Sequence, residues 1–228
     1  MSNMTPTVPE ITYSNSVWKE DRTCLLWLDQ HPPKTVVYVS IGSLAILTLD
    51  QLLEIWYGLV NSKKPFLWVR RPGSITGGYD ELRVPIELLE ATKDMGCVVN
   101  WAPQEDVLAH RAIGGFLTHC GWNSTLESIV QGIPMICWPF YVDQLVNSRF
   151  VGEVWNVGID IKDTCNRLIV EKAVRDVMDL KQEAFTQSTS TWENLAKESI
   201  NEKGSSSMNL DRLIDDIKAM TNAYHTTT

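Results

Sequence analysis

The chain has 228 residues, of which 44% are hydrophobic, so it can bury one substantial core and a single domain is expected. Its formal net charge of −8 at pH 7 argues against nucleic acid or an anionic membrane surface as a partner. No apolar run approaches the length of a bilayer span and no signal-peptide pattern opens the chain. The five cysteines, an odd number without paired spacing, indicate reduced thiols in a cytoplasmic protein.

Polar residues and prolines near the start predict a linker or a disordered segment over residues 1–15. Apolar, β-branched runs then alternate with helical patterns. The runs predict strands over residues 35–41, 65–70, 97–101, 114–119, 134–139 and 157–161. The patterns between them predict helices over residues 48–61, 86–94, 104–111, 123–131 and 143–155. Thr48 and Gln51 offer a capping box for the first helix, and Pro103 suits the first turn of the third.

The strand signal stops after residue 162. Helical patterns follow near residues 169–187, 190–202 and 209–220, and residues 223–228 are predicted to be a disordered tail. This alternation predicts an α/β fold, a Rossmann-like doubly wound parallel sheet of about six strands with C-terminal helices packed outside it.

Two turns of the predicted sheet can bind phosphate. If the strand order is 3-2-1-4-5-6, the first and fourth strands are neighbours, and ligands bind at that switch point beyond the carboxyl ends of the strands. The first strand ends in Gly42-Ser43 and the fourth ends in His119-Cys120-Gly121. We therefore expect these two turns to meet in space.

The segment from Trp101 to Gln144 carries most of the functional signal. Within it, the fourth strand of the predicted sheet runs into Gly121-Trp122-Asn123-Ser124 and then into a helix. The start of such a helix exposes unpaired N–H groups and the positive end of the helix dipole. Trp101 upstream can stack on a base, while Asp143 and Gln144 downstream can bind hydroxyl groups. A base platform, a phosphate site and a hydroxyl-binding pair in this order indicate a nucleotide-sugar site.

This segment resembles the signature box of the plant secondary-product UDP-glycosyltransferases. Trp-Ala-Pro-Gln opens it, His-Cys-Gly-Trp-Asn-Ser-Thr-x-Glu lies in its middle and Asp-Gln closes it. The resemblance spans roughly residues 16–222 and includes Ser16–Asp21, Leu26–Asp29, Val37–Ser43 and Gly204–Ser207. It implies a GT-B architecture of two similar domains, of which residues 16–222 correspond to the C-terminal UDP-sugar-binding domain. The N-terminal acceptor domain is expected to be absent from this chain.

The resemblance also implies a role for individual residues. Trp101 would stack on uracil while Ala102 and Gln104 read the edge of the ring. Glu127 would bind the ribose hydroxyls, and Asp143 and Gln144 would bind those of the sugar. The groups expected around the diphosphate are Ser43, His119, Gly121, Asn123 and Ser124, and Trp122 and Tyr141 complete the predicted UDP-sugar site.

Several of these residues have an ordinary structural interpretation as well. Trp101 can be one more buried aromatic residue, and Glu127 can be a solvated carboxylate on a helix face. His119 can be a structural histidine, or a metal ligand with a neighbouring cysteine, although no second Cys/His pair has a suitable spacing. Asn123, Ser124 and Asp143 can be ordinary helix-capping residues, because Asn, Ser and Asp are the residues preferred at helix N-caps.

The function implied is UDP-glucose binding in an inverting glucosyltransferase that acts on hydroxyl groups of small plant metabolites. The catalytic histidine is expected in the absent half, so no catalytic residue is assigned to this chain, and no metal or cofactor is expected. The acceptor would bind through the missing domain. In relatives the last helix crosses back to that domain, so an exposed apolar stripe at Leu210, Leu213, Ile214 and Ile217 would promote self-association.

Two other functions stay open on the sequence. One is a stand-alone nucleotide-sugar binding module. The other is a dinucleotide-dependent oxidoreductase domain, which is disfavoured because no G-x-G-x-x-G follows the first strand. In addition, the second strand ends in Val69-Arg70-Arg71, without the acidic residue that would bind a ribose in such a domain.

Overall fold

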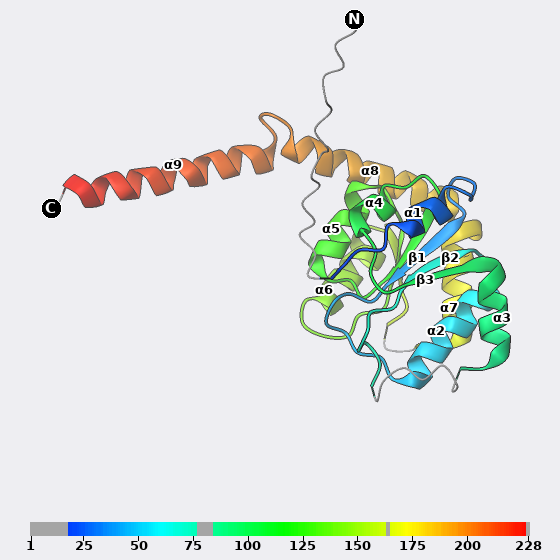
Figure 1. Ribbon diagram of the computed structural model, residues 1–228. Helices are drawn as coiled ribbons and strands as arrows, with labels where there is room; N and C mark the ends of the chain where they lie inside the picture. Colours follow the sequence, from blue (N-terminus) through cyan, green and yellow to red (C-terminus); the bar gives the residue numbers. More distant parts are fainter. Residues whose placement is uncertain (1–17, 77–83, 163–164, 227–228) are drawn as a thin grey trace, which may run out of the picture.

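The computed structural model describes residues 18–76, 84–162 and 165–226, so the predicted linker at residues 1–15 lies outside the described residues. Its centre is a parallel sheet with the strand order β3-β2-β1-β4-β5-β6, which confirms the predicted topology (Figure 1). The strands are β1 (Val36–Ser40), β2 (Phe66–Val69), β3 (Gly96–Val99), β4 (Ile113–Thr118), β5 (Met135–Cys137) and β6 (Gly158–Asp160).

Helices cover both faces of this sheet. The helices are α1 (Thr23–Leu28), α2 (Leu49–Ser62), α3 (Ile86–Met95), α4 (Gln104–Leu108), α5 (Trp122–Val130), α6 (Gln144–Arg149), α7 (Arg167–Arg175), α8 (Gln182–Ile200) and α9 (Ser205–Thr226). Two π-helical turns, η2 (Phe150–Val154) and η3 (Asp176–Leu180), continue α6 and α7. The buried residues of α2, α3, α7 and η3 pack on one face, and those of α1, α4 and η2 pack on the other.

Strand β1 shows why the sheet is buried on both sides. Side chains of a strand alternate between its faces, and all of β1 is buried. Val37 and Val39 join the apolar cluster under α2, whereas Val36 and Tyr38 join the cluster on the opposite face. Such continuous apolar runs are typical of strands at the centre of a parallel sheet.

The predicted capping box of α2 is present. The Thr48 hydroxyl accepts from the Gln51 N–H at 3.2 Å, and the Gln51 side chain accepts from the Thr48 N–H at 2.9 Å. Pro103 takes the N-cap position of α4. Helix α1 was not predicted, because it is short and its N-cap residue, Arg22, makes no side-chain capping hydrogen bond.

The predicted break between residues 187 and 190 was wrong, because α8 runs through it. The sequence there is rich in serine and threonine, which usually favours a turn. In the helix, Thr189 donates to the Phe185 carbonyl at 2.8 Å and Thr191 donates to the Gln187 carbonyl at 3.1 Å. These bonds to the preceding turn satisfy the hydroxyls without interrupting the helix.

Helix α9 projects away from the sheet and its covering helices (Figure 1). It extends beyond both ends of the predicted 209–220 segment, and its residues from Met208 to Thr221 are exposed. Within the described part of the chain, we find no helix with the length and apolar content needed to span a bilayer.

Candidate functional site

The two predicted phosphate-binding turns meet at the carboxyl edge of the sheet. Strands β1 and β4 pair in parallel, with Ser40 opposite Thr118, so the turns that follow them are neighbours. Gly42 has a φ of +74°, and a Cβ at this position would overlap the imidazole of His119. A Cβ at Gly121 would lie 2.5 Å from the His119 Nε2 atom. The ring of His119 is therefore held between two glycines, as the predicted topology required.

Burial affects both the pKa and the hydrogen bonding of His119. Burial lowers the pKa of His119 below its ordinary value, and the nearby Asp143 carboxylate opposes part of that shift. Its Nδ1 atom is buried and has no hydrogen-bond partner. A neutral imidazole can present an N–H donor at Nε2, which lies on the side of the two glycine turns.

The start of α5 is free of side-chain caps. The N-cap residue is Gly121, so neither Asn123 nor Ser124 caps the helix, and the capping interpretation of these two residues was wrong. Trp122 and Asn123 are exposed, whereas Ser124 is buried. The first N–H groups of α5 therefore lie beside the imidazole of His119 with no protein side chain capping them. Ser43 lies exposed in the turn that follows β1.

A hydrogen-bonded cluster fixes the predicted ribose carboxylate. The Gln104 Nε2 amide donates to the Glu127 Oε2 atom at 2.6 Å and to the Ser124 Oγ atom at 2.9 Å. The Tyr38 hydroxyl donates to the Gln104 Oε1 atom at 3.2 Å. Glu127 is therefore not a freely solvated carboxylate. The side chain of Gln104, which is predicted to read the base, contacts both Glu127 and Ser124 and links them.

Trp101 follows β3 and opens the segment that leads into α4. It is partly exposed, and Ala102 beside it is buried. The Trp101 carbonyl accepts from the Asp21 N–H at 2.8 Å. The centroid of its ring lies 6.4 Å from that of Trp18, at an interplanar angle of 33°. Trp101 is thus not one more fully buried aromatic residue.

Asp143 and Gln144 begin α6 and have different environments. Asp143 makes no capping hydrogen bond, which overturns its capping interpretation. Instead its Oδ2 atom accepts from the Asn147 Nδ2 amide at 2.8 Å, and the same nitrogen donates to the Cys120 carbonyl at 2.9 Å. The Gln144 Oε1 atom accepts from the N–H groups of Phe140 at 2.9 Å and Tyr141 at 3.2 Å.

Asn147 was missed by the sequence analysis. It is buried, and it ties Asp143 to the turn that carries His119. The four-residue spacing from Asp143 on a predicted helix could have indicated the contact.

Trp122 and Tyr141 are exposed, and both follow strands at the same carboxyl edge of the sheet. No group of three or more His, Cys, Asp or Glu residues within the described ranges is arranged to hold a metal ion.

Comparisons with known proteins show the family to which this chain belongs. The family model "UDP-glucoronosyl and UDP-glucosyl transferase" matches residues 3–191. A 7-deoxyloganetic acid glucosyltransferase from Catharanthus roseus is 55% identical over 216 residues, which cover 95% of this chain and 45% of that protein. The chain thus spans slightly under half the length of this relative.

Solved structures show the same fold. Os79 from O. sativa in complex with UDP is 36% identical, with a TM-score of 0.80 over 88% of this chain and 44% of that one. Phytolacca americana UGT2, complexed with UDP-2fluoro-glucose and pterostilbene, is 35% identical, with a TM-score of 0.76 over 86% of this chain and 44% of that one. The described domain corresponds to one half of a GT-B architecture. The chain belongs to the UDP-glucoronosyl and UDP-glucosyl transferase family.

Proposed function

We propose that this chain is the UDP-glucose-binding domain of an inverting glucosyltransferase that acts on hydroxyl groups of small plant metabolites. The observation that carries the proposal is the meeting of the Gly42 and Gly121 turns around His119, beside the uncapped start of α5. Hydrogen-bond donors and a positive helix end converge there, which suits a diphosphate. The structures of relatives with UDP and with UDP-2fluoro-glucose support this assignment.

Each part of the donor is assigned to one part of the site. Trp101 stacks on uracil, and Ala102 and Gln104 read the edge of the ring. The ribose hydroxyls bind to Glu127, whose carboxylate Gln104 already orients. The diphosphate binds between Ser43, His119, Gly121, Asn123 and Ser124. The glucose hydroxyls bind to Asp143 and Gln144, with Trp122 and Tyr141 beside them.

The reaction assigned to the whole enzyme divides between two domains. A histidine of the other half would deprotonate the acceptor hydroxyl, and that oxygen would attack the anomeric carbon in line, with inversion, as UDP leaves. On this side, the N–H donors and His119 stabilise the charge that grows on the leaving diphosphate. These donors take the place of a divalent cation in the proposal. UDP affinity should therefore be the same in EDTA and in Mg²⁺.

Equilibrium dialysis with labelled nucleotide sugars tests the proposal. The purified chain should bind UDP-glucose and release it when unlabelled UDP is added. ADP-glucose carries the same sugar and diphosphate on a different base, so it should compete poorly. Equal competition by UDP and ADP-glucose would show that the site does not recognise the base.

Glu127 should make the site sensitive to the ribose. A carboxylate that accepts from both hydroxyls should favour UDP over 2′-deoxy-UDP by about 1.5–3 kcal/mol, the range for hydrogen bonds to charged groups. Glu127→Gln should erase most of this preference, as measured by calorimetry. Glu153→Gln, on the exposed surface of η2, is the matched control and should leave it intact. Equal affinities of the parent chain for the two nucleotides would contradict the assignment.

Gln144 should influence the choice of sugar. Its carbonyl oxygen is occupied by two backbone N–H groups, so its amide nitrogen is the end assigned to the sugar. Gln144→His should narrow the preference for UDP-glucose over UDP-galactose by about three- to tenfold, the value of one neutral hydrogen bond. Gln144→Glu keeps an acceptor for the turn but has no N–H donor. If Gln144→Glu binds UDP-glucose and UDP-galactose with the same affinities as the parent, residue 144 only stabilises the turn at Phe140 and Tyr141 and does not bind the sugar.

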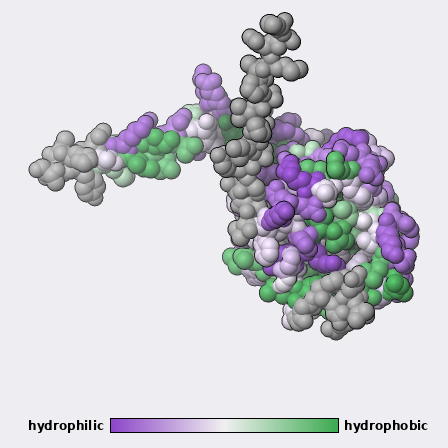
Figure 2. Space-filling view, in the orientation of Figure 1, coloured by the Kyte–Doolittle hydropathy of each residue, from purple (hydrophilic) through white to green (hydrophobic). Residues whose placement is uncertain are grey.

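We also propose that α9 mediates self-association of this chain. Figure 2 shows apolar surface along the projecting helix. Its apolar residues are between 40% and 65% exposed and include Leu210, Leu213, Ile214, Ile217 and Met220. Sedimentation velocity should detect a concentration-dependent dimer that Ile217→Asp abolishes. Leu180→Asp, at an exposed site outside α9, should not affect it, and a parent chain that stays monomeric at high concentration would refute the proposal.

A cytoplasmic location is proposed from the cysteines. All five are free thiols, and Cys24, Cys120 and Cys137 are buried. Free thiols are typical of proteins in reducing compartments. Fractionation of plant cells with an antibody to this chain tests the location.

A further inference from the structure

Trp18 lies beside the proposed base platform. Its ring centroid is 6.4 Å from that of Trp101, at a tilt of 33°, which is within the range of aromatic pairs. Trp18 itself is 38% exposed, so burial in the core does not account for its position. It belongs to the segment that precedes α1, far from Trp101 in the sequence, and the donor site described above gives it no role.

The segment that carries Trp18 is fastened to the Trp101 loop. The Asp21 N–H donates to the Trp101 carbonyl at 2.8 Å. One residue later, the Arg22 Nη2 atom donates to the Asp106 Oδ2 atom of α4 at 2.5 Å. Cys24 then enters the apolar cluster on this face of the sheet. These contacts fix the backbone on which Trp18 sits relative to the loop that carries Trp101.

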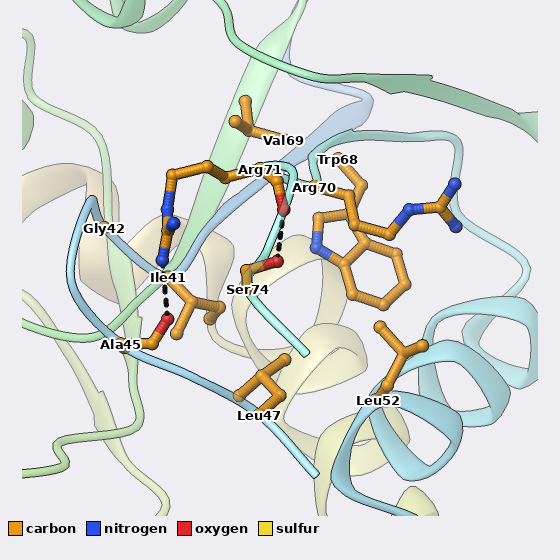
Figure 3. A pocket seen from close by; sticks show the side chains of 10 residues that line it. All are labelled: Ile41, Gly42, Ala45, Leu47, Leu52, Trp68, Val69, Arg70, Arg71 and Ser74. Atoms are coloured by element: carbon orange, nitrogen blue, oxygen red, sulfur yellow. Dashed lines mark hydrogen bonds between the residues drawn. The ribbon is translucent and has the colours of Figure 1, made fainter. Parts of the chain in front are cut away.

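Arg71, which follows β2, also contacts the ring of Trp18. The Arg71 Cζ atom lies 5.9 Å from the centroid of the Trp18 ring. Its Nη2 atom donates to the Ala45 carbonyl at 3.3 Å, as Figure 3 shows, and its own carbonyl accepts from the Ser74 hydroxyl at 2.6 Å. Ala45 belongs to the loop that follows Gly42. Through Arg71, Trp18 is therefore linked to the loop beside the proposed diphosphate site.

The spacing of the two tryptophan rings decides what Trp18 can do. A base inserted between them would need two stacking contacts of about 3.5 Å, or about 7 Å in total. The observed 6.4 Å is shorter than that, so a base is not sandwiched between the two rings. We propose that Trp18, which Arg71 contacts, is a positioning residue that supports the Trp101 ring and sets its orientation toward the uracil base.

This inference rests on the proposal that Trp101 stacks on uracil. Dihydro-UDP provides the probe, because its saturated ring keeps the hydrogen-bonding edge of uracil but loses its flat aromatic face. The 228-residue chain should bind UDP about tenfold or more tightly than dihydro-UDP. Trp18→Ala should weaken UDP binding by about three- to tenfold and dihydro-UDP binding much less, so the ratio of the two affinities falls.

Two further variants separate positioning from general damage to the fold. Trp18→Phe keeps an aromatic support and should restore most of the ratio. Trp27→Ala removes a tryptophan from the same segment whose ring pairs with His31, at 4.1 Å, instead of Trp101. It should lower the melting temperature without changing the ratio of the two affinities.

A spectroscopic measurement covers the case in which Trp18→Ala does not fold. In the parent chain labelled with 5-fluorotryptophan, the ¹⁹F resonance of Trp18, identified through Trp18→Phe, should shift when UDP binds, while that of Trp27 should not. An unchanged ratio in folded Trp18→Ala, or a Trp18 resonance that UDP does not move, would overturn the inference. A parent chain that binds UDP and dihydro-UDP equally would instead refute base stacking itself, so the two failures are distinguishable.

Discussion

Purified 228-residue chain should bind UDP-glucose and yet form no glycoside with any hydroxyl acceptor. Loss of a general base costs about 10²–10⁴-fold in rate, and loss of acceptor positioning costs about 10⁵-fold or more. The rate of glucose transfer by this chain should therefore be more than about 10⁷-fold below that of a two-domain enzyme of the same family. Acceptor screens with radiolabelled UDP-glucose, run beside a dialysis measurement of donor binding, provide the test.

Three of the four histidines of the chain support this expectation. His31 contacts the Trp27 carbonyl and His110 contacts Asp29, and both lie near the amino end of β1, away from the donor site. His119 is held between the two glycine turns. A full-length relative in the same screen shows that the assay detects product. Robust glycoside formation by this chain alone would place a catalytic base within it and contradict the division of labour proposed here.

Trp101→Ala should weaken UDP binding by about tenfold or more. Stacking of one base on an aromatic ring is worth about 1–3 kcal/mol by alanine substitution. Trp101 is partly exposed and already has its backbone fixed by Asp21, so the variant should keep its fold. Calorimetry gives the affinity, and circular dichroism reports on the fold.

The control for this substitution is Trp101→Phe. Phenylalanine keeps a flat aromatic face of smaller area, so UDP affinity should lie between those of the parent and the alanine variant. A folded Trp101→Ala variant with unchanged UDP affinity would remove Trp101 from the base site.

The order of the sheet could be predicted from sequence because it depends on regular patterns. Apolar runs alternate with amphipathic ones, and right-handed crossovers leave few possible topologies. Helix ends followed the prediction where a specific cap exists, as at Thr48. The prediction of helix ends failed at α8, where the threonine hydroxyls bond within the helix. It also failed at α1, which is short and whose N-cap residue, Arg22, makes no side-chain capping bond.

The candidate site also has features that the sequence predicts and features that it does not. The turns at Gly42 and His119 were predicted to meet because strand order alone brings them together. The contacts of Gln104 with Glu127 and of Trp18 with Trp101 join residues far apart in the sequence. Such side-chain contacts depend on loop conformations and rotamers, which no spacing rule specifies.

Calorimetric titration of this chain with UDP, and separately with NAD, tests the central claim most directly. Both ligands carry a diphosphate and a ribose, and both can be bound by Rossmann-like sheets. We expect saturable binding of UDP at a single site and no binding of NAD at the same concentrations. Absence of UDP binding by the folded chain, or equal binding of NAD, would contradict the assignment of this domain to a UDP-sugar donor.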